Sequence, residues 1–251
     1  MSAKRRRIFN PNPTQYVAST EDEYINFLYT EIYREFFNIA SEFIPTDSAR
    51  VLELGAGSLT KAHDFFPNLI SSDGSEGTKY GKESFLRAER LPFQSNSFEL
   101  IIAKDTLHHF EDTEKALIEI HRVLSRDGVF IVSEPNWSLF GRFIFRFFHP
   151  EKWNPKAKSL KNESPDPTDA NQAQLLCLTK QPNSSLVSNA LFDLTVMHST
   201  FGLSYILSGG LNWRSKVPSS ILCQIYKVER RFPFVLERIT GINRIGIFTK
   251  A

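Results

Sequence analysis

Between residues 50 and 60 the chain reads Arg50-Val51-Leu52-Glu53-Leu54-Gly55-Ala56-Gly57-Ser58-Leu59-Thr60. Apolar residues around a single carboxylate, Glu53, indicate a buried strand, and the two glycines that follow indicate a tight turn. Glycine adopts backbone conformations closed to other residues and lets a ligand approach the main chain closely. We expect a helix to begin near Ser58 or Thr60. A ligand at this turn would lie at the carboxyl end of a parallel strand, where open α/β sheets usually bind their ligands.

Strands and helices are predicted to alternate along the rest of the chain. Apolar runs predict strands at 51–54, 69–72, 98–103, 129–133, 192–197 and 243–249. Apolar spacing of three and four predicts helices at 20–43, 61–66, 113–124 and 218–239, the last one broken near Pro233. This alternation favours a parallel sheet with helices on both faces. The predicted fold is therefore α/β, a Rossmann-like, doubly wound, mostly parallel seven-stranded sheet.

The segment before the first strand is predicted to form a basic tail and one helix. Apolar residues follow one face of this helix at Ile25, Leu28, Ile32, Phe36, Ile39 and Phe43. Thr20 and Glu23 have the spacing of a capping box at its start, and Pro45 follows its end. The helix is expected outside the sheet core, either as a plain packing helix or as a lid over the glycine turn. We therefore divide the chain into 1–45, a tail and N-terminal lid helix, and 46–251, one main domain with a cap inserted after the fifth strand at about 136–190.

Composition and charge limit the classes of protein that the chain can belong to. The 251 residues are 41% hydrophobic and 23% charged, which is ordinary for a globular protein. The net charge is +2, and because Lys4-Arg5-Arg6-Arg7 contributes +4, the remainder sums to −2. That balance argues against a nucleic-acid partner. Two cysteines, Cys177 and Cys223, form neither a metal-spaced cluster nor a disulfide framework, so we expect no metal and a reducing, cytoplasmic setting.

Asp73 is the first candidate for a binding role outside the glycine turn. It ends the second predicted strand, twenty residues after Glu53. In a doubly wound sheet an acid at this place hydrogen-bonds the hydroxyls of a ribose. The alternative is a turn aspartate, because Asp73-Gly74 is a common turn pair.

Further motifs complete a resemblance to a known family. The glycine turn, Asp73, Leu91-Pro92-Phe93 and the stretch Asp105-Thr106-Leu107-His108-His109-Phe110 together resemble class I S-adenosylmethionine-dependent methyltransferases. Within that class the chain is most similar to the type 11 small-molecule methyltransferase domain, over roughly residues 50–135. The resemblance implies that 46–251 is a methyltransferase domain and that S-adenosyl-L-methionine is the cofactor. It implies cofactor contacts from Glu53, Gly55, Ala56, Gly57, Asp73, Gly74, Ala88, Glu89 and Lys104, with Asp73 on the ribose.

Catalytic and acceptor-binding residues are expected at the carboxyl ends of the strands. Methyl transfer to an oxygen of high pKa benefits from a base that removes its proton. His108 and His109 are the catalytic candidates because neutral imidazole is available near pH 7. The alternative is that they only line or cap the pocket. Asp105, Glu134 and Asn136 are the candidates for binding the acceptor.

The stretch 137–148 gives the only indication of the acceptor. It is aromatic and apolar, interrupted by Arg142 and Arg146 four residues apart. It is either a helix that packs the cap against the sheet or an amphipathic face for a lipid surface or a lipid-linked acceptor, with peripheral membrane contact. Loose similarity to methyltransferases of surface-polysaccharide biosynthesis is carried by Glu134-Pro135-Asn136, Phe148-His149-Pro150 and Ser208-Gly209-Gly210.

Three functional hypotheses follow. The first is S-adenosylmethionine-dependent methyl transfer to a small or lipid-linked, oxygen-bearing acceptor such as a sugar. The second is a catalytically inactive, methyltransferase-like binding module, favoured by Leu59 and Arg87, which stand where the family often has glycine and aspartate. The third, a nicotinamide-dependent dehydrogenase, is disfavoured because Gly55–Thr60 lacks the final glycine of the G-x-G-x-x-G fingerprint. The sequence does not indicate the oligomeric state.

Overall fold

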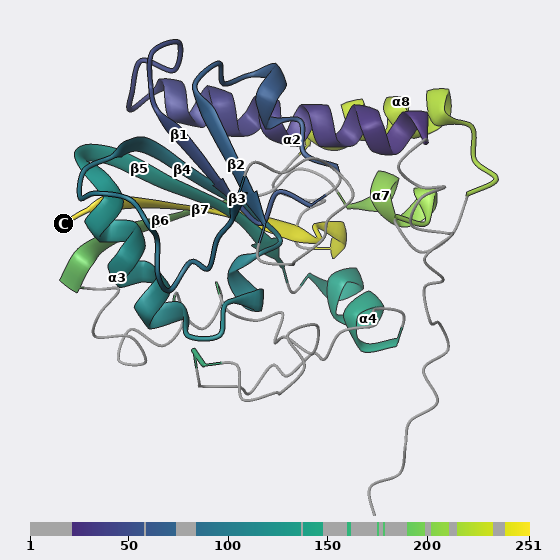
Figure 1. Ribbon diagram of the computed structural model, residues 1–251. Helices are drawn as coiled ribbons and strands as arrows, with labels where there is room; N and C mark the ends of the chain where they lie inside the picture. The colour runs from purple at the N-terminus through teal and green to yellow at the C-terminus, as the bar shows by residue number, and fades with distance from the viewer. Residues whose placement is uncertain are drawn as a thin grey trace, which may run out of the picture.

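The structure, a computed structural model, describes residues 22–57, 59–73, 84–136, 138–147, 160–161, 175, 178, 190–198, 202–210, 215–232 and 239–251. One sheet runs through its centre, with helices above and below it (Figure 1). The strands are β1 (Val51–Leu54), β2 (Leu69–Asp73), β3 (Ser84–Phe85), β4 (Phe98–Lys104), β5 (Leu124–Pro135), β6 (Phe192–His198) and β7 (Asn243–Lys250). The helices are α2 (Glu23–Ser41), α3 (Thr113–Val123), α4 (Leu139–Phe147), α7 (Leu203–Ser208) and α8 (Ser219–Arg231), with 3₁₀ turns η1 (Ala62–Asp64) and η2 (Leu107–His109).

The strand order is β3-β2-β1-β4-β5-β7-β6. Strands β1 to β5 pair in parallel, with β1 between β2 and β4, whereas β7 runs antiparallel to both β5 and β6. The chain moves outward from β1 to β2 and β3, then returns to the other side of β1 as β4. The order therefore reverses between β1 and β4, which is where open α/β sheets leave a crevice for a ligand. The predicted α/β, Rossmann-like fold is confirmed.

Two hydrophobic clusters cover the two faces of the sheet, as alternation along the strands requires. In β1, Val51 points into the cluster that holds α2 and α8, and Leu52 points into the cluster that holds α3. Figure 1 shows α2 and α8 along one face and α3 on the other. The apolar stripe of α2 is buried against the sheet, and Phe36 is fully buried there. The helix thus shares one core with 46–251.

Two details of the predicted helices are wrong. The helix expected at 61–66 is only the 3₁₀ turn η1. The helix expected from Thr20 begins at Glu23, because the Asp22 side chain accepts from the N–H groups of Tyr24 and Ile25 and caps it instead. The described residues do not include 1–21, the range that contains Thr20, or most of the predicted cap at 136–190. No helix in the described part of the chain combines the length and the apolar character needed to span a membrane.

Candidate functional site

The glycine turn after β1 is shaped differently at its two glycines. Both have positive φ, +68° at Gly55 and +55° at Gly57, a region that L side chains rarely adopt. A Cβ on Gly55 would lie 2.2 Å from Cγ2 and Oγ1 of Thr106, which follows β4. Among the residues that the structure describes, a Cβ on Gly57 would meet nothing within 4 Å. The turn is therefore packed against β4 at Gly55, whereas no described residue closes the space at Gly57.

Asp73 lies beside the open end of this turn, as the sequence predicts. Its Oδ2 accepts a hydrogen bond from the Gly57 N–H at 3.0 Å. The Ala56 N–H donates to the Ser72 carbonyl at 2.9 Å, so β2 supports the turn at both Ala56 and Gly57. An acidic side chain and a glycine-lined space therefore meet at the carboxyl ends of β1 and β2. Gly74 and Ser58 lie outside the described residues.

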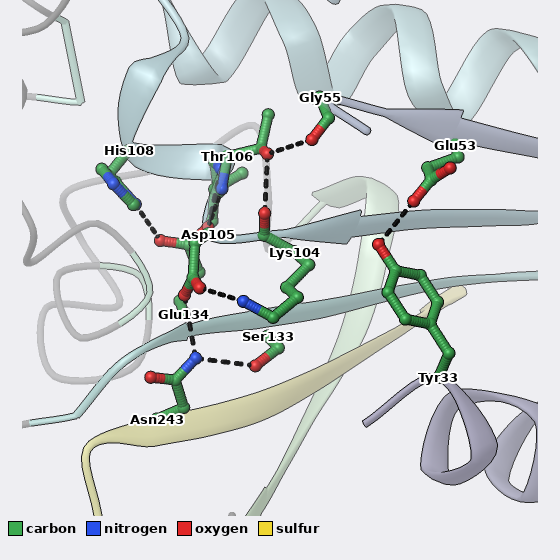
Figure 2. Close-up of polar contacts among 11 residues, drawn as sticks. Tyr33, Glu53, Gly55, Lys104, Asp105, Thr106, His108, Ser133, Glu134 and Asn243 are labelled. Atoms are coloured by element: carbon green, nitrogen blue, oxygen red, sulfur yellow. Dashed lines mark hydrogen bonds and ion pairs between the residues drawn. The ribbon is translucent and has the colours of Figure 1, made fainter. Parts of the chain in front are cut away.

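Glu53 is buried, and hydroxyl groups surround its carboxylate. The donors are Tyr33 of α2 at 2.6 Å, Ser71 of β2 at 2.7 Å, and Thr60, which lies 2.7 and 2.9 Å from the two oxygens. Burial, followed by the Glu53 charge, raises the pKa of Tyr33 well above its ordinary value, so the phenol stays protonated and donates. The carboxylate therefore links α2 to the turn and to β2, and Figure 2 shows its hydrogen bond with Tyr33. Its predicted contact with a cofactor stays a prediction.

A second polar group lies at the end of β4 and reaches across to β7. Asp105 has φ +50°, a strained value for a residue with a side chain. Its carboxylate accepts from the Lys104 ammonium and, at 2.8 Å, from the Asn243 amide, which also donates to Ser133 Oγ at 3.1 Å (Figure 2). The Lys104 ammonium also lies 4.3 Å from the centre of the Tyr29 ring on α2. Burial, the largest single influence, lowers the pKa of Lys104, but the charge and hydrogen bond of Asp105 together with Tyr29 and Tyr205 outweigh it, so the net direction is upward and the lysine is a cation.

Glu134, at the end of β5, holds the loop that carries the two histidines. Its Oε1 accepts from the backbone N–H groups of Thr106 and Leu107 at 2.9 and 2.7 Å, and its Oε2 lies 2.5 Å from Nδ1 of His108 (Figure 2). Both side chains are buried, Glu134 at 1% exposure and His108 at 2%. The ring centres of His108 and His109 are 4.3 Å apart. The structure thus joins three candidates predicted separately, with Glu134 positioning His108.

The other predicted site residues have partners of their own. Asn136 is buried, and its amide donates to the Gly241 carbonyl at 3.2 Å. Ala88 is buried, and Glu89 accepts from the Asp112 N–H at 3.3 Å. The predicted roles of these residues toward acceptor and cofactor stay predictions. No group of three or more His, Cys, Asp or Glu side chains in the described ranges is arranged to hold a metal ion.

Tyr29, Tyr33 and Asn243 were missed by sequence reasoning. The two tyrosines read as members of an ordinary apolar helix face, and Asn243 reads as the polar start of a strand. One signal in the sequence could have been used: Tyr29 and Tyr33 are four residues apart, which places their side chains on the same face of a helix.

The sheet order, the glycine turn and the acid at the end of β2 define an α/β protein of the Rossmann-like class. Within that class, residues 49–132 match the type 11 methyltransferase family, described as a methyltransferase domain. The matched segment contains the turn, Asp73 and the loop of His108 and His109.

Relatives match this chain over parts of their length, and they are methyltransferases and an arginine-hydroxylase. An uncharacterized methyltransferase of Bacillus subtilis, YcgJ, is 36% identical over 99 residues, 33% of this chain and 39% of the relative. The arginine-hydroxylase NDUFAF5 of Mus musculus is 49% identical over 43 residues, 17% of this chain and 12% of that protein. The demethylmenaquinone methyltransferase of Streptomyces griseus is 29% identical over 131 residues, 47% of this chain and 56% of the enzyme. The chain thus spans less than two thirds of each of these relatives.

Among solved structures, a SAM-dependent methyltransferase of Thermotoga maritima covers 90% of this chain and 92% of its own, with 19% identity and a TM-score of 0.49. The family match and the methyltransferase relatives support a class I methyltransferase, for which dependence on S-adenosylmethionine is implied by the family. The finer resemblance to surface-polysaccharide enzymes is not supported by these comparisons.

Proposed function

We propose that this chain transfers a methyl group from S-adenosylmethionine to an oxygen of a small or lipid-linked acceptor, such as a sugar. One observation carries the proposal: the glycine turn opens at Gly57 beside the Asp73 carboxylate, at the point where the strand order reverses. The low cysteine content supports a cytoplasmic setting.

The residues around the turn fit this cofactor. The space at Gly57 allows close approach of a ligand to the main chain, and Asp73 supplies a carboxylate that can accept from ribose hydroxyls. Gly55, Ala56, Gly57 and Asp73 would hold the cofactor's methionine and ribose parts, with Ala88 and Glu89 along the adenine. When bound, S-adenosylmethionine supplies a methyl group already activated as a sulfonium, so the protein has mainly to align it with the acceptor.

The two departures from the family pattern direct their side chains away from this space. Leu59 is buried in the core cluster with α2, so its bulk does not narrow the turn. Arg87 forms two hydrogen bonds, of 3.0 and 2.9 Å, with the exposed carboxylate of Glu111. The buried position of Leu59 favours an active enzyme over the alternative, an inactive methyltransferase-like binding module, whereas Arg87, which has only donors, leaves the acceptor that the family's aspartate supplies unreplaced.

The acceptor would meet the ends of β4 and β5. The Asp105 side chain is 38% exposed, against 8% for Lys104, so Asp105 is the better placed of the two to accept from an acceptor hydroxyl. An ionised Glu134 can only accept, which puts the proton of a neutral His108 on Nδ1 and the lone pair on Nε2. His108 in this tautomer, or His109, would take the acceptor proton as the oxygen attacks the methyl group.

Calorimetric titration with S-adenosylmethionine tests the proposal. We expect micromolar-range binding that Asp73→Ala weakens at least about tenfold, roughly 1.4 kcal/mol. Asp73→Asn keeps an acceptor for the Gly57 N–H and should preserve the turn while still weakening binding. Asp127→Ala removes an exposed carboxylate at the start of β5, the opposite edge of the sheet, and should bind normally.

The titration also decides between the hypotheses. Absence of binding by the folded protein would contradict the enzyme and favour the binding module. Binding would justify a screen of sugars and lipid-linked sugars for release of S-adenosylhomocysteine, in which His108→Asn should be slower than the native chain at equal cofactor affinity.

A further inference from the structure

Helix α4 is attached tightly to the acceptor side of the sheet. It begins four residues after Pro135, the last residue of β5. A Cβ on Gly141 would lie 2.5 Å from the Asn136 carbonyl oxygen, so the first turn of the helix packs directly on the chain that leaves β5. Ser138, directly before the helix, caps this first turn, because its Oγ accepts from the Gly141 N–H at 2.9 Å. Figure 1 shows α4 at the end of the sheet, apart from the layer of α2 and α8.

Most of the circumference of α4 faces outward, and one side of this exposed surface is apolar. Only Gly141 and Phe145 of the helix are buried. The exposed apolar side chains are Leu139 at 69%, Phe140 at 42%, Phe143 at 52% and Phe147 at 46%. At 100° per residue, Leu139, Phe143 and Phe147 form one stripe along the helix, and Phe140 widens it. Four large apolar side chains gathered on a helix this short mark an interaction site.

The charges of α4 indicate what covers this stripe. Arg142 and Arg146 lie between the apolar stripe and the buried face, and the nine residues contain no acid. The Arg146 guanidinium lies 5.3 Å from the centre of the Phe147 ring, so charge and apolar surface are contiguous. Aromatic residues on one face and arginines beside them are typical of helices that lie in the plane of a membrane, with the arginines reaching anionic headgroups.

We propose that α4 docks on the surface of an anionic lipid bilayer, with Leu139, Phe140, Phe143 and Phe147 entering the headgroup region and Arg142 and Arg146 binding lipid phosphates. Because α4 follows β5 directly, docking brings the end of the sheet that holds Glu134 and Asp105 toward the membrane. A lipid-linked acceptor would then reach the site along the bilayer surface. This last step rests on the proposed function, whereas the docking itself does not.

Helix α8 provides a matched control, because it has an exposed apolar stripe of its own. Ile221 is 47% exposed and Val228 is 53% exposed, seven residues apart on one face. This helix lies with α2 on a different side of the molecule from α4 (Figure 1). A general attraction of apolar residues to lipid would therefore depend on both helices, whereas the proposed docking depends on α4.

Co-sedimentation of the full chain with vesicles tests the docking. The vesicles are phosphatidylcholine alone or phosphatidylcholine with phosphatidylglycerol. We expect preferential binding to the anionic vesicles, reduced at least roughly tenfold by Phe143→Ser/Phe147→Ser. Arg142→Gln/Arg146→Gln should remove most of the preference for anionic lipid. Ile221→Ser/Val228→Ser should bind as the native chain does, and each variant is titrated with S-adenosylmethionine and melted to verify its fold.

Four results would overturn the proposal. The native chain could bind S-adenosylmethionine yet no anionic vesicles, in which case the proposed function survives alone. Phe143→Ser/Phe147→Ser could bind vesicles normally, which would mean that another part of the chain, for example Lys4–Arg7, binds the lipid. Ile221→Ser/Val228→Ser could lose as much vesicle binding as Phe143→Ser/Phe147→Ser. Phe143→Ser/Phe147→Ser could convert a native dimer into a monomer without changing vesicle binding, which would make the stripe a contact between two copies of the chain. Conversely, vesicle binding with no cofactor binding would leave the docking standing and refute the proposed function.

Discussion

Gly55 and Gly57 belong to one turn but are glycines for different reasons. Both need positive φ, yet within the described part of the chain only Gly55 is closed in by a neighbouring side chain, that of Thr106. Thr106 in turn donates from Oγ1 to the carbonyls of Lys104 at 2.9 Å and Gly55 at 3.3 Å. Gly55 thus serves the packing of β1 against β4, whereas Gly57 keeps space at the site open.

Alanine at the two positions should separate these roles. Gly57→Ala should cost about 1–2 kcal/mol of unfolding free energy from its backbone conformation alone and should weaken S-adenosylmethionine binding. Gly55→Ala should lose roughly 1–3 kcal/mol more than Gly57→Ala because of the overlap with Thr106, and Thr106→Ala should restore part of that loss. Urea unfolding and titration with the cofactor measure both effects. Equal losses of stability at the two glycines would mean that Thr106 does not enclose Gly55.

Sequence reasoning found the residues that lie within a continuous pattern. The glycines and Asp73 were predicted because a strand end and a following turn can be recognised in a single stretch of chain. Tyr33 and Asn243 were not, because their partners Glu53 and Asp105 lie 20 and 138 residues away. Contacts of this kind depend on the strand order and on the rotation of α2, neither of which is encoded near the residue itself.

Elements of regular structure followed their apolar patterns, and the failures have local causes. The segment 61–66 is too short for a stable helix, and Pro67 disfavours helical backbone in the residue before it. In addition, Thr60 Oγ1 accepts from the Ala62 N–H at 3.1 Å while bound to Glu53, which fixes the chain in a turn. The position of the 3₁₀ turn η1 is thus decided by the site rather than by helix propensity.

Helices α7 and α8 are joined through a buried carboxylate. Glu229 of α8 is 3% exposed, and its oxygens accept from the N–H of Leu203 at 2.5 Å, from the N–H of Ser204 at 3.2 Å and from Ser204 Oγ. Burial raises the pKa of Glu229 above its ordinary value, and these hydrogen bonds offset only part of that rise. The carboxyl therefore links the start of α7 to the last turn of α8, at an electrostatic cost when it is ionised.

The pH dependence of stability should reveal this cost. The pKa of Glu229 is higher in the folded than in the unfolded chain. Its contribution to the free energy of unfolding is therefore greatest below its ordinary pKa of 4.5 and is lost as pH rises through the pKa of the folded chain. The stability of the native chain relative to Glu229→Gln should therefore increase from pH 7 to pH 4, as measured by urea unfolding at each pH. Glu99 provides the opposite control: hydrogen bonds from Arg50 lower its pKa, so the native chain should lose stability relative to Glu99→Gln over the same interval. If the difference in unfolding free energy between the native chain and Glu229→Gln did not change with pH, the raised pKa of Glu229 in the folded chain would be contradicted.

At the scale of the whole molecule, the sheet ties α2 to everything that follows it. The predicted division at residue 45 stays a prediction, and in the structure α2 contributes to the same hydrophobic core as the sheet. Ile25, Phe36 and Ile39 of α2 share a cluster with β1, β4, β5, β7 and α8. The Glu53–Tyr33 hydrogen bond and the contact of Lys104 with Tyr29 add two polar links at the site end of the helix. We therefore expect α2 and the sheet to unfold together.

Phe36→Ala tests this expectation, since Phe36 is fully buried between α2 and the sheet. Loss of the ring should cost about 3–5 kcal/mol of unfolding free energy. The three tryptophans of the chain, Trp137, Trp153 and Trp213, all lie outside residues 1–45, so their fluorescence reports on the rest of the molecule. Because α2 shares its core with the sheet, the fluorescence transition should shift in urea as far as the far-UV circular dichroism transition does. Phe43→Ala, at a residue 43% exposed just beyond α2, should shift neither by more than roughly 1 kcal/mol. A fluorescence transition unmoved by Phe36→Ala, with an earlier and separate loss of helical signal, would instead show α2 to be an independent unit docked on a sheet that folds without it.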